Sequence, residues 1–166
     1  MAGRAGGRRY WLLKSEPEAC SFRDVVAAPR RRTAWDGVRN YQARNLLRDE
    51  VRAGDFALFY HSGTKLPGVA GIARIARGAE PDPTQFDPDS ERFDPKSSRS
   101  DPTWVQVVVE AVQEFPTFVP LDLLRRQPAL AGMALLRRGQ RLSVQPVTEK
   151  EWRSILALGG IDARRS

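Results

Sequence analysis

Short apolar runs, separated by clusters of Gly, Pro, Asp and Ser, divide this chain into strand-sized pieces. The run at 104–115 is the longest and the richest in β-branched residues, which favour the pleated geometry of a sheet. Turn-forming residues such as Gly54 and Asp55 stand between the runs and end them. The pattern predicts about five strands, at residues 10–14, 56–61, 69–76, 104–115 and 141–147.

Helix start signals mark four further segments of the chain. Ser21 is followed three residues later by Asp24, and Thr148 is followed in the same way by Glu151, so both pairs match the capping-box pattern. Asn40 can cap a helix by accepting a hydrogen bond from a backbone N–H of its first turn. These three signals predict helices at 22–28, at YQARNLLR directly after Asn40 and at 149–158, and Pro120 at a first helical position predicts a fourth at 121–126.

The order of these elements indicates the fold class. The helices interrupt the strands without strict alternation, and no Gly-rich phosphate loop follows the first strand, so a doubly wound parallel sheet fits poorly. The sequence predicts an α+β fold in which helices surround a small, strongly curved mixed sheet or open barrel of about five strands. At 166 residues the chain is one domain. We expect a disordered basic tail at 1–9, the domain at 10–160 and a C-terminal tail at 161–166.

The formal net charge of +7 is distributed unevenly. Residues 80–101 contain seven acidic and three basic side chains and so carry a net charge of −4, whereas the rest of 10–160 carries +7. A polarised basic surface is the electrostatic footprint expected of a nucleic-acid-binding protein. Composition leaves open the alternative that these arginines are only solvated surface residues.

Several classes of site and location are excluded by what the chain lacks. Cys20 is the only cysteine and His61 the only histidine, which excludes an internal disulfide and a Cys/His zinc site. No apolar run approaches the roughly 18 residues that cross a bilayer, and no apolar segment of a secretory signal follows the basic N-terminus. We therefore expect no bound metal and no membrane attachment, and a location in the cytoplasm or, in a eukaryote, the nucleus.

Motifs for cofactors and catalysis are also missing. The chain has neither GxGxxG nor GxxxxGK[ST], so we expect no nucleotide cofactor. His61 and Ser62 are adjacent and have the residue types of a hydrolase, but neighbours in a strand point to opposite faces of a sheet. No Gly-x-Ser-x-Gly elbow accompanies them. We therefore predict that this protein is not an enzyme and has no catalytic residue.

The segment WDGVRNYQARNLLR, residues 35–48, carries the most suggestive chemistry. It presents the aromatic ring of Trp35, a turn with exposed backbone amides, a helix N-terminus and then a basic stripe that begins at Arg44 and recurs every four residues. Such a combination suits a planar, polar ligand attached to an anionic backbone. The alternative is an ordinary capped amphipathic helix with a buried Trp at its entrance.

Several long motifs occur in an order that resembles the EVE-domain family, over a stretch from Tyr10 to about Leu158. The motifs are YWLLKSEP, WDGVRNYQARNLLR, FYHSGTKLPGVAGIARI, FDPDSERFDPKS, W-x-x-V-x-V and RLSVQPVTEKEW. The resemblance implies a PUA-like open β-barrel that reads a modified base, such as methylated or hydroxymethylated cytosine in DNA, or a modified base in RNA. The Arg-rich N-terminal tail and Cys20, where relatives often have an aromatic residue, depart from the family pattern.

Three other functions stay open beside that of a modified-base reader. One is a PUA-like RNA-binding module that reads no modification, and another is a protein-interaction module with a vestigial pocket. A third is a hydrolase of modified nucleosides that uses Asp36 or His61. For each hypothesis in which the protein binds nucleic acid, we expect a monomer whose partner is DNA or RNA.

A base reader must take the nucleotide out of its stack, at a cost of a few kcal/mol. Trp35 is the predicted plate on which the base stacks, which returns roughly 1–3 kcal/mol, and Tyr60 is a candidate second wall. Polar side chains from the ends of the strands would bind the base edge, and basic ones the adjoining phosphate or sugar. The predicted ligand-binding residues are Lys14, Ser15, Trp35, Asp36, Gly37, Val38, Arg39, Asn40, Tyr60, His61, Ser62, Ser143, Val144, Gln145 and Pro146.

Overall fold

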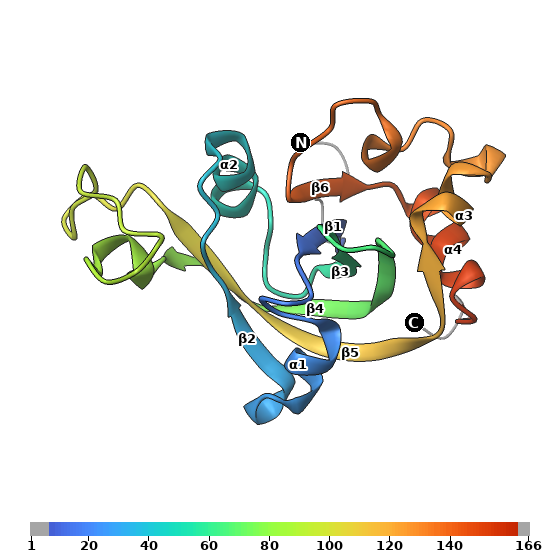
Figure 1. Cartoon of the computed structure of the whole chain (residues 1–166), viewed down its shortest axis with the longest axis horizontal. Coiled ribbons are helices and arrows are strands. Elements are labelled where there is room, and N and C mark those ends of the chain that lie inside the picture. Colours follow the sequence, from blue (N-terminus) through green and yellow to red (C-terminus); the bar gives the residue numbers. More distant parts are fainter. Residues whose placement is uncertain (1–6, 163–166) are drawn as a thin grey trace.

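A curved, mixed β-sheet with helices packed on it makes up residues 7–162, the part of the chain that the computed structural model describes (Figure 1). The order across the sheet is β2-β5-β4-β3-β1-β6. β1 is parallel to β3, and all other neighbours are antiparallel. The strands are β1 (Tyr10–Ser15), β2 (Arg32–Trp35), β3 (Phe56–His61), β4 (Gly68–Pro81), β5 (Val105–Pro120) and β6 (Val144–Val147). Within the described chain the two edges, β2 and β6, do not pair, so the barrel stays open.

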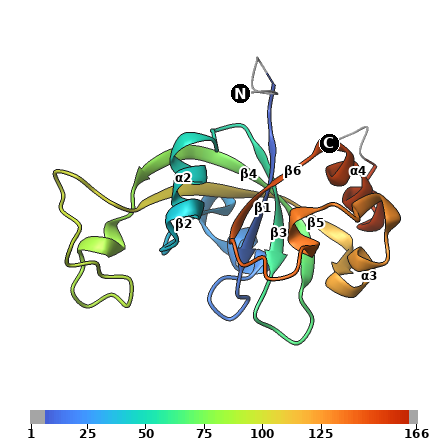
Figure 2. The same ribbon diagram turned by 90° about the horizontal axis from the view of Figure 1, so that it is seen from above.

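Four α-helices and four short 3₁₀ turns surround the sheet. Figure 2 shows α2 above the sheet, where it contacts β4, β5 and β6 and so covers part of the opening. The helices are α1 (Phe22–Ala27), α2 (Tyr41–Asp49), α3 (Leu121–Arg125) and α4 (Glu149–Leu158). The 3₁₀ turns are η1 (Pro29–Arg31), η2 (Pro83–Phe86), η3 (Pro128–Leu130) and η4 (Ala134–Leu136). The prediction of an α+β fold built on an open barrel with helices around it is confirmed.

The predicted helix caps form as expected. The side chains of Ser21 and Thr148 accept from the backbone three residues on, and the partner carboxylates of Asp24 and Glu151 complete both capping boxes. The side-chain oxygen of Asn40 accepts from the backbone N–H of Ala43 at 2.9 Å. Each cap satisfies an N–H group that the first turn of a helix would otherwise leave without a partner.

Two strand predictions need correction. β2 is not among the five predicted strands; it forms because Thr33 and Trp35 pair with Val109 and Val107 of β5. β5 also continues beyond residue 115, through two prolines. Pro116 lies where the pairing of β5 with β4 changes register, between Glu114 and Val119, and Pro120 is the last residue of the strand, so neither interrupts a regular stretch of the ladder.

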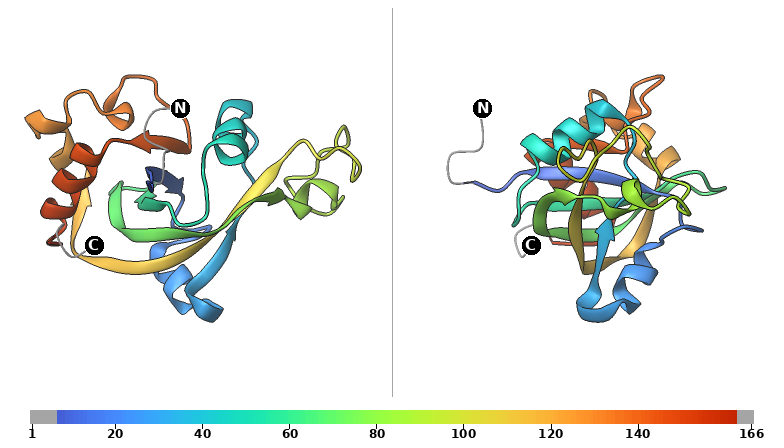
Figure 3. Two further views of the ribbon diagram at one scale, coloured as in Figure 1. Left: turned by 180° about the vertical axis from the view of Figure 1, so that it is seen from behind. Right: turned by 90° about the vertical axis from the view of Figure 1, so that its left-hand side faces the viewer.

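The strands carry alternate side chains to two separate cores. Leu13, Trp35 and Phe59 belong to an inner core that α1 and α2 also supply, whereas Leu12 and Tyr60 belong to an outer core against α3 and α4. Figure 3 shows α3 and α4 at the end of the molecule opposite the long loop that follows β4. Trp35 and Tyr60 therefore lie on opposite faces of the sheet.

The acidic loop between β4 and β5, residues 82–104, projects from the body of the molecule and is hereafter called the projecting segment (Figure 1). Hydrogen bonds of buried polar side chains hold it in place. The buried Gln85 amide donates to the carbonyls of Asp82 and Trp104 and accepts from the Trp104 N–H. The Trp104 indole donates to Asp94 at 2.7 Å. Phe93 of this segment is 39% exposed and so does not anchor it.

The domain extends slightly beyond the predicted boundaries. Arg9 was assigned to a disordered tail, yet its backbone N–H donates to Asp55 and its guanidinium pairs with Glu50 at 2.9 Å. Ile161, assigned to the C-terminal tail, is buried. Residues 1–6 and 163–166 of the two predicted tails lie outside the described residues. Between residues 7 and 162 there is no helix with the length and apolar character that crossing a bilayer requires.

Candidate functional site

A cavity of about 450 Å³ lies at the unclosed seam of the barrel. It is bordered by the ends of β1 and β2, the turn into α2, the loop before β6 and one side chain of the projecting segment. Cavities of this size hold small organic ligands, and a nucleoside is within the range. The lining residues are Lys14, Ser15, Glu16, Ala19, Cys20, Ala34, Trp35, Asp36, Gly37, Val38, Arg39, Asn40, Ser62, Arg92, Arg141 and Ser143.

Backbone hydrogen bonds bring these distant segments together. The N–H of Lys14 donates to the carbonyl of Ser143 at 2.9 Å, which fixes the approach to β6 beside the end of β1. The N–H of Ser62 donates to the carbonyl of Ser15 at 2.9 Å, where the parallel pairing of β1 and β3 ends. The cavity walls therefore follow from strand pairing and do not depend on mobile side chains.

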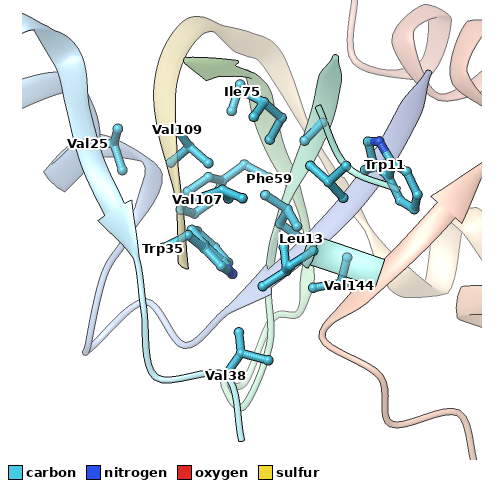
Figure 4. Packing of buried hydrophobic residues seen from close by; sticks show 14 of the residues in the cluster. Trp11, Leu13, Val25, Trp35, Val38, Phe59, Ile75, Val107, Val109 and Val144 are labelled. Atoms are coloured by element: carbon cyan, nitrogen blue, oxygen red, sulfur yellow. The ribbon is translucent and has the colours of Figure 1, made fainter. Parts of the chain in front are cut away.

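Trp35 lines this cavity and packs against the inner core. Its ring meets Phe59 edge-on, with centroids 5.4 Å apart and planes at 89°, and the residue is 7% exposed. Figure 4 shows Trp35 beside Val107 and Phe59 of the inner core. Because packing holds the indole from behind, a ligand would meet a wall whose orientation is set before binding.

The turn after Trp35 is fastened to the projecting segment. The N–H of Gly37 donates to the Asp82 carboxylate at 2.8 Å, and the guanidinium of Arg39 donates to the same oxygen at 3.0 Å and to Thr84 at 2.9 Å. Although burial opposes ionisation, hydrogen bonds from Thr84, Gly37 and Arg39 hold the pKa of Asp82 below its usual value. Arg39 was predicted to contact phosphate, but its guanidinium is engaged in this structural network.

Ionisable groups in the cavity have shifted pKa values. Loss of hydration, together with the nearby carboxylate of Asp82, raises the pKa of Asp36, which forms no ion pair within the described chain. Burial lowers the pKa of the Lys14 ammonium. Perturbed groups around a cavity are typical of a binding or catalytic site.

Three cations at the cavity are available to a ligand. Within residues 7–162, the side chains of Lys14, Arg92 and Arg141 make no hydrogen bond or ion pair, and all three line the cavity. Sequence reasoning missed Arg92 and Arg141, although each stands inside one of the family-like motifs. The residues around Arg92 and Arg141 in the sequence do not show that these side chains line the cavity. Tertiary packing alone brings the projecting segment and the loop before β6 together there.

Two predicted aromatic residues lie away from this cavity. Tyr60, the expected second wall, is 3% exposed and belongs to the outer core. His61 accepts the backbone N–H of Phe22 through Nε2 at 3.1 Å, in a separate hollow with Phe118, and burial lowers its pKa. Neither side chain borders the Trp35 cavity.

The β6 residues also lie elsewhere. Val144 is fully buried in the inner core, Gln145 donates to the carbonyl of Leu142 at 2.9 Å, and Pro146 is exposed outside the cavity. Of the predicted segment, the loop residue Ser143 reaches the cavity. The remaining predicted residues do line it: Lys14, Ser15, Trp35, Asp36, Gly37, Val38, Arg39, Asn40 and Ser62.

Metal chemistry has no cluster of ligands to support it in the described part of the chain. No group of three or more His, Cys, Asp and Glu side chains between residues 7 and 162 is arranged to hold an ion.

Comparisons with known proteins give the family context of this cavity. The sequence model of the EVE domain matches residues 9–158. Human thymocyte nuclear protein 1 is 42% identical over 166 aligned residues, which cover 90% of this chain and 73% of that protein. A crystal structure of a Pseudomonas putida protein is 47% identical, covers 90% of this chain and 99% of its own, and has a TM-score of 0.84. The crystal structure of human THYN1 protein in complex with DNA containing 5-methylcytosine is 40% identical, covers 93% of this chain and 99% of its own, and has a TM-score of 0.86.

Proposed function

This chain belongs to the EVE-domain family, and it is similar to human THYN1, whose structure contains DNA with 5-methylcytosine. We therefore propose that this protein is a non-catalytic, nucleic-acid-binding reader of a modified base. The base, such as methylated or hydroxymethylated cytosine, enters the cavity beside Trp35. The observation that carries the proposal is the pre-set indole wall of a cavity large enough for a nucleoside.

Stacking on the indole offsets the cost of extracting the base. Taking a base out of a strand or duplex costs a few kcal/mol, and stacking on an aromatic side chain returns roughly 1–3 kcal/mol. Trp35 is fixed by Phe59 from behind, so little conformational entropy is lost when the base stacks.

Polar groups around the indole match the edge of a cytosine. An ionised Asp36 accepts a hydrogen bond from the exocyclic amine of the base, and a protonated Asp36 also donates to the ring nitrogen beside that amine. The raised pKa of Asp36 favours this second, paired arrangement. The hydroxyl of Ser143 and the amide N–H₂ of Asn40, whose oxygen is occupied by the helix cap, are further partners.

The modification itself is read by the smaller lining groups. Ala19, Cys20 and Val38 supply apolar surface for a methyl group. Enclosing one methyl is worth about 0.8 kcal/mol by area and roughly 1–3 kcal/mol in a tight niche. A hydroxymethyl group needs an added polar partner, for which Ser143 or Asp36 is available.

Phosphates next to the bound base are met by the cations at the cavity. Lys14, Arg92 and Arg141 have no competing ion pair within the described residues, whereas Arg39 is tied to Asp82. Phosphate contacts position the strand and add affinity without reading sequence. We expect the binding to weaken steeply with salt.

A binding role suits these side chains better than catalysis. Burial, together with the carboxylates of Asp24 and Asp36, raises the pKa of Cys20, so its thiol stays protonated and is a poor nucleophile. His61 lies in a different hollow, with Nε2 already occupied.

The test is binding of single-stranded oligonucleotides, with and without 5-methylcytosine, to wild type, Trp35→Leu and Tyr60→Phe at two salt concentrations. Trp35→Leu keeps much of the apolar volume but removes the plate, so we expect at least about fivefold weaker binding. Tyr60→Phe alters the outer core alone and should bind like wild type. Equal affinity of wild type and a folded Trp35→Leu would refute the stacked base, and competition with RNA of the same sequence tests the RNA alternative.

A further inference from the structure

The first residue of α2, Tyr41, exposes an aromatic ring to solvent. The residue is 60% exposed, and it directly follows Asn40, which lines the cavity and caps the helix. A tyrosine is not needed to begin a helix, because the cap is already supplied by Asn40. Burial in a core does not explain it either, since most of its surface faces solvent.

The exposed ring is held in place from below. Its centroid lies 4.8 Å from the Trp104 ring at an angle of 34°, and the indole of Trp104 is itself fixed by its hydrogen bond to Asp94. The guanidinium of Arg44 lies 5.0 Å from the Tyr41 ring and 5.9 Å from the Trp104 ring, and it donates to the carbonyl of Thr103 at 3.0 Å. Tyr41 is therefore part of a rigid stack of aromatic and cationic groups that ends at the surface.

A rigid exposed ring with a cation beside it suits a nucleobase that is linked to a phosphate. Aromatic side chains bind every base through its π-face, and a neighbouring Arg adds attraction to the ring and to the phosphate. Tyr41 packs on Trp104, whose ring lies 5.4 Å from the guanidinium of the cavity-lining Arg39, so a strand that leaves the cavity on this side leads toward Tyr41. The occupant that fits is thus a neighbouring base of the same strand.

We propose that Tyr41 is a second stacking surface, which holds the base adjacent to the one on Trp35; this inference rests on the function proposed above. Stacking does not distinguish bases, so Tyr41 adds affinity for modified and unmodified strands alike. The residues that line the cavity determine how strongly a modified base is preferred over an unmodified one. The two aromatic residues therefore have separable effects on affinity and on selectivity.

The test pairs protein variants with abasic oligonucleotides. Wild type, Tyr41→Ala and Tyr41→Phe are titrated with single-stranded DNA that contains one 5-methylcytosine and an abasic site on its 5′ side, on its 3′ side or on neither. Wild type should lose at least about fivefold in affinity with one of the abasic strands. Tyr41→Ala should show that loss already with the intact strand and no further loss with the abasic strand, whereas Tyr41→Phe should behave like wild type.

Two controls separate this inference from its premise. Val112→Ala removes an exposed apolar side chain that does not line the cavity, and it should bind like wild type. If Tyr41→Ala and wild type lose the same factor on the abasic strand, Tyr41 does not hold that base and the inference fails, even while Trp35→Leu still binds weakly. If Trp35→Leu binds like wild type, the premise fails and the inference falls with it. Thermal melts of all variants confirm that each is folded.

Discussion

The guanidinium of Arg39 donates to the carboxylate of Asp82 at 3.0 Å, and the acid of this pair is completely buried. The same carboxylate accepts the N–H of Gly37, so one buried acid fastens the turn after Trp35 to the projecting segment. Arg39 lines the cavity, whereas Asp82 lies outside it, so the pair supports the cavity wall from behind its lining. The integrity of the site therefore depends on a residue 46 positions beyond Asp36, in a loop whose acidic composition suggests only solvated charge.

Replacing Asp82 by Ala should destabilise the protein strongly. The change leaves the Arg39 charge and the Gly37 N–H without their buried partner, at a cost of about 3 kcal/mol. Urea unfolding measures the loss. Asp89→Ala is the matched control, because Asp89 is an exposed acid of the same segment and should change the unfolding free energy by less than about 0.5 kcal/mol. Equal unfolding midpoints for the two variants would contradict the anchoring role.

Acid should weaken the fold through the same carboxyl. The folded pKa of Asp82 is lowered, so the folded state binds this proton less readily than the unfolded chain does. The resulting stabilisation is present above the ordinary aspartate pKa of about 3.9 and is lost as the pH falls through the lowered folded value. Unfolding free energies measured across this range should fall more steeply for wild type than for Asp82→Asn. Identical slopes would show that Asp82 is not the responsible group.

Gly37→Ala should be costly for a different reason. Gly37 has φ +76°, a conformation that costs other residues about 1–2 kcal/mol, and an added Cβ would lie 3.2 Å from Nε of Arg92. Gly132→Ala is the control, because nothing lies within 4 Å of an added Cβ there. Thermal unfolding should show a lower midpoint for Gly37→Ala than for Gly132→Ala, and the reverse order would refute the strain argument.

The sequence predicts features that depend on residues close together in the chain. It predicts less well those that depend on contacts between distant segments. The caps at Ser21, Asn40 and Thr148 form because each depends on residues three positions away. β2 was missed because RTAW has little strand character of its own and exists through pairing with β5. Arg9 was wrongly given to a tail because its partners, Asp55 and Glu50, lie more than forty residues away.

The composition of the cavity shows the same division. Asp36, Gly37 and Val38 line the cavity because they form the turn between β2 and α2 that borders it. Tyr60 was placed in the cavity from its aromatic type, but the alternation of β3 sends it to the outer core. Arg92 and Arg141 were overlooked because only the folded chain brings the projecting segment and the loop before β6 to the same hollow.

Removing the cations should weaken binding without changing preference. Arg92→Ala and Arg141→Ala should each lower affinity for methylated and unmethylated strands by the same factor, since phosphate contacts carry no information about the base. Each should also reduce the slope of log affinity against log salt by about 0.7, the value for one phosphate contact on a single strand. Arg153→Ala, on α4 and paired with Glu149, is the control and should leave the slope unchanged. A loss confined to the methylated strand would contradict the phosphate role.

The most direct measurement follows the four indole N–H signals by ¹H–¹⁵N NMR while a 5-methylcytosine oligonucleotide is added. The signal missing from Trp35→Phe identifies Trp35, and a stacked base should shift it strongly through its ring current. Trp11 and Trp152, buried in the two cores, should keep their positions. Saturable binding that leaves the Trp35 signal in place would show that the base does not lie against this indole.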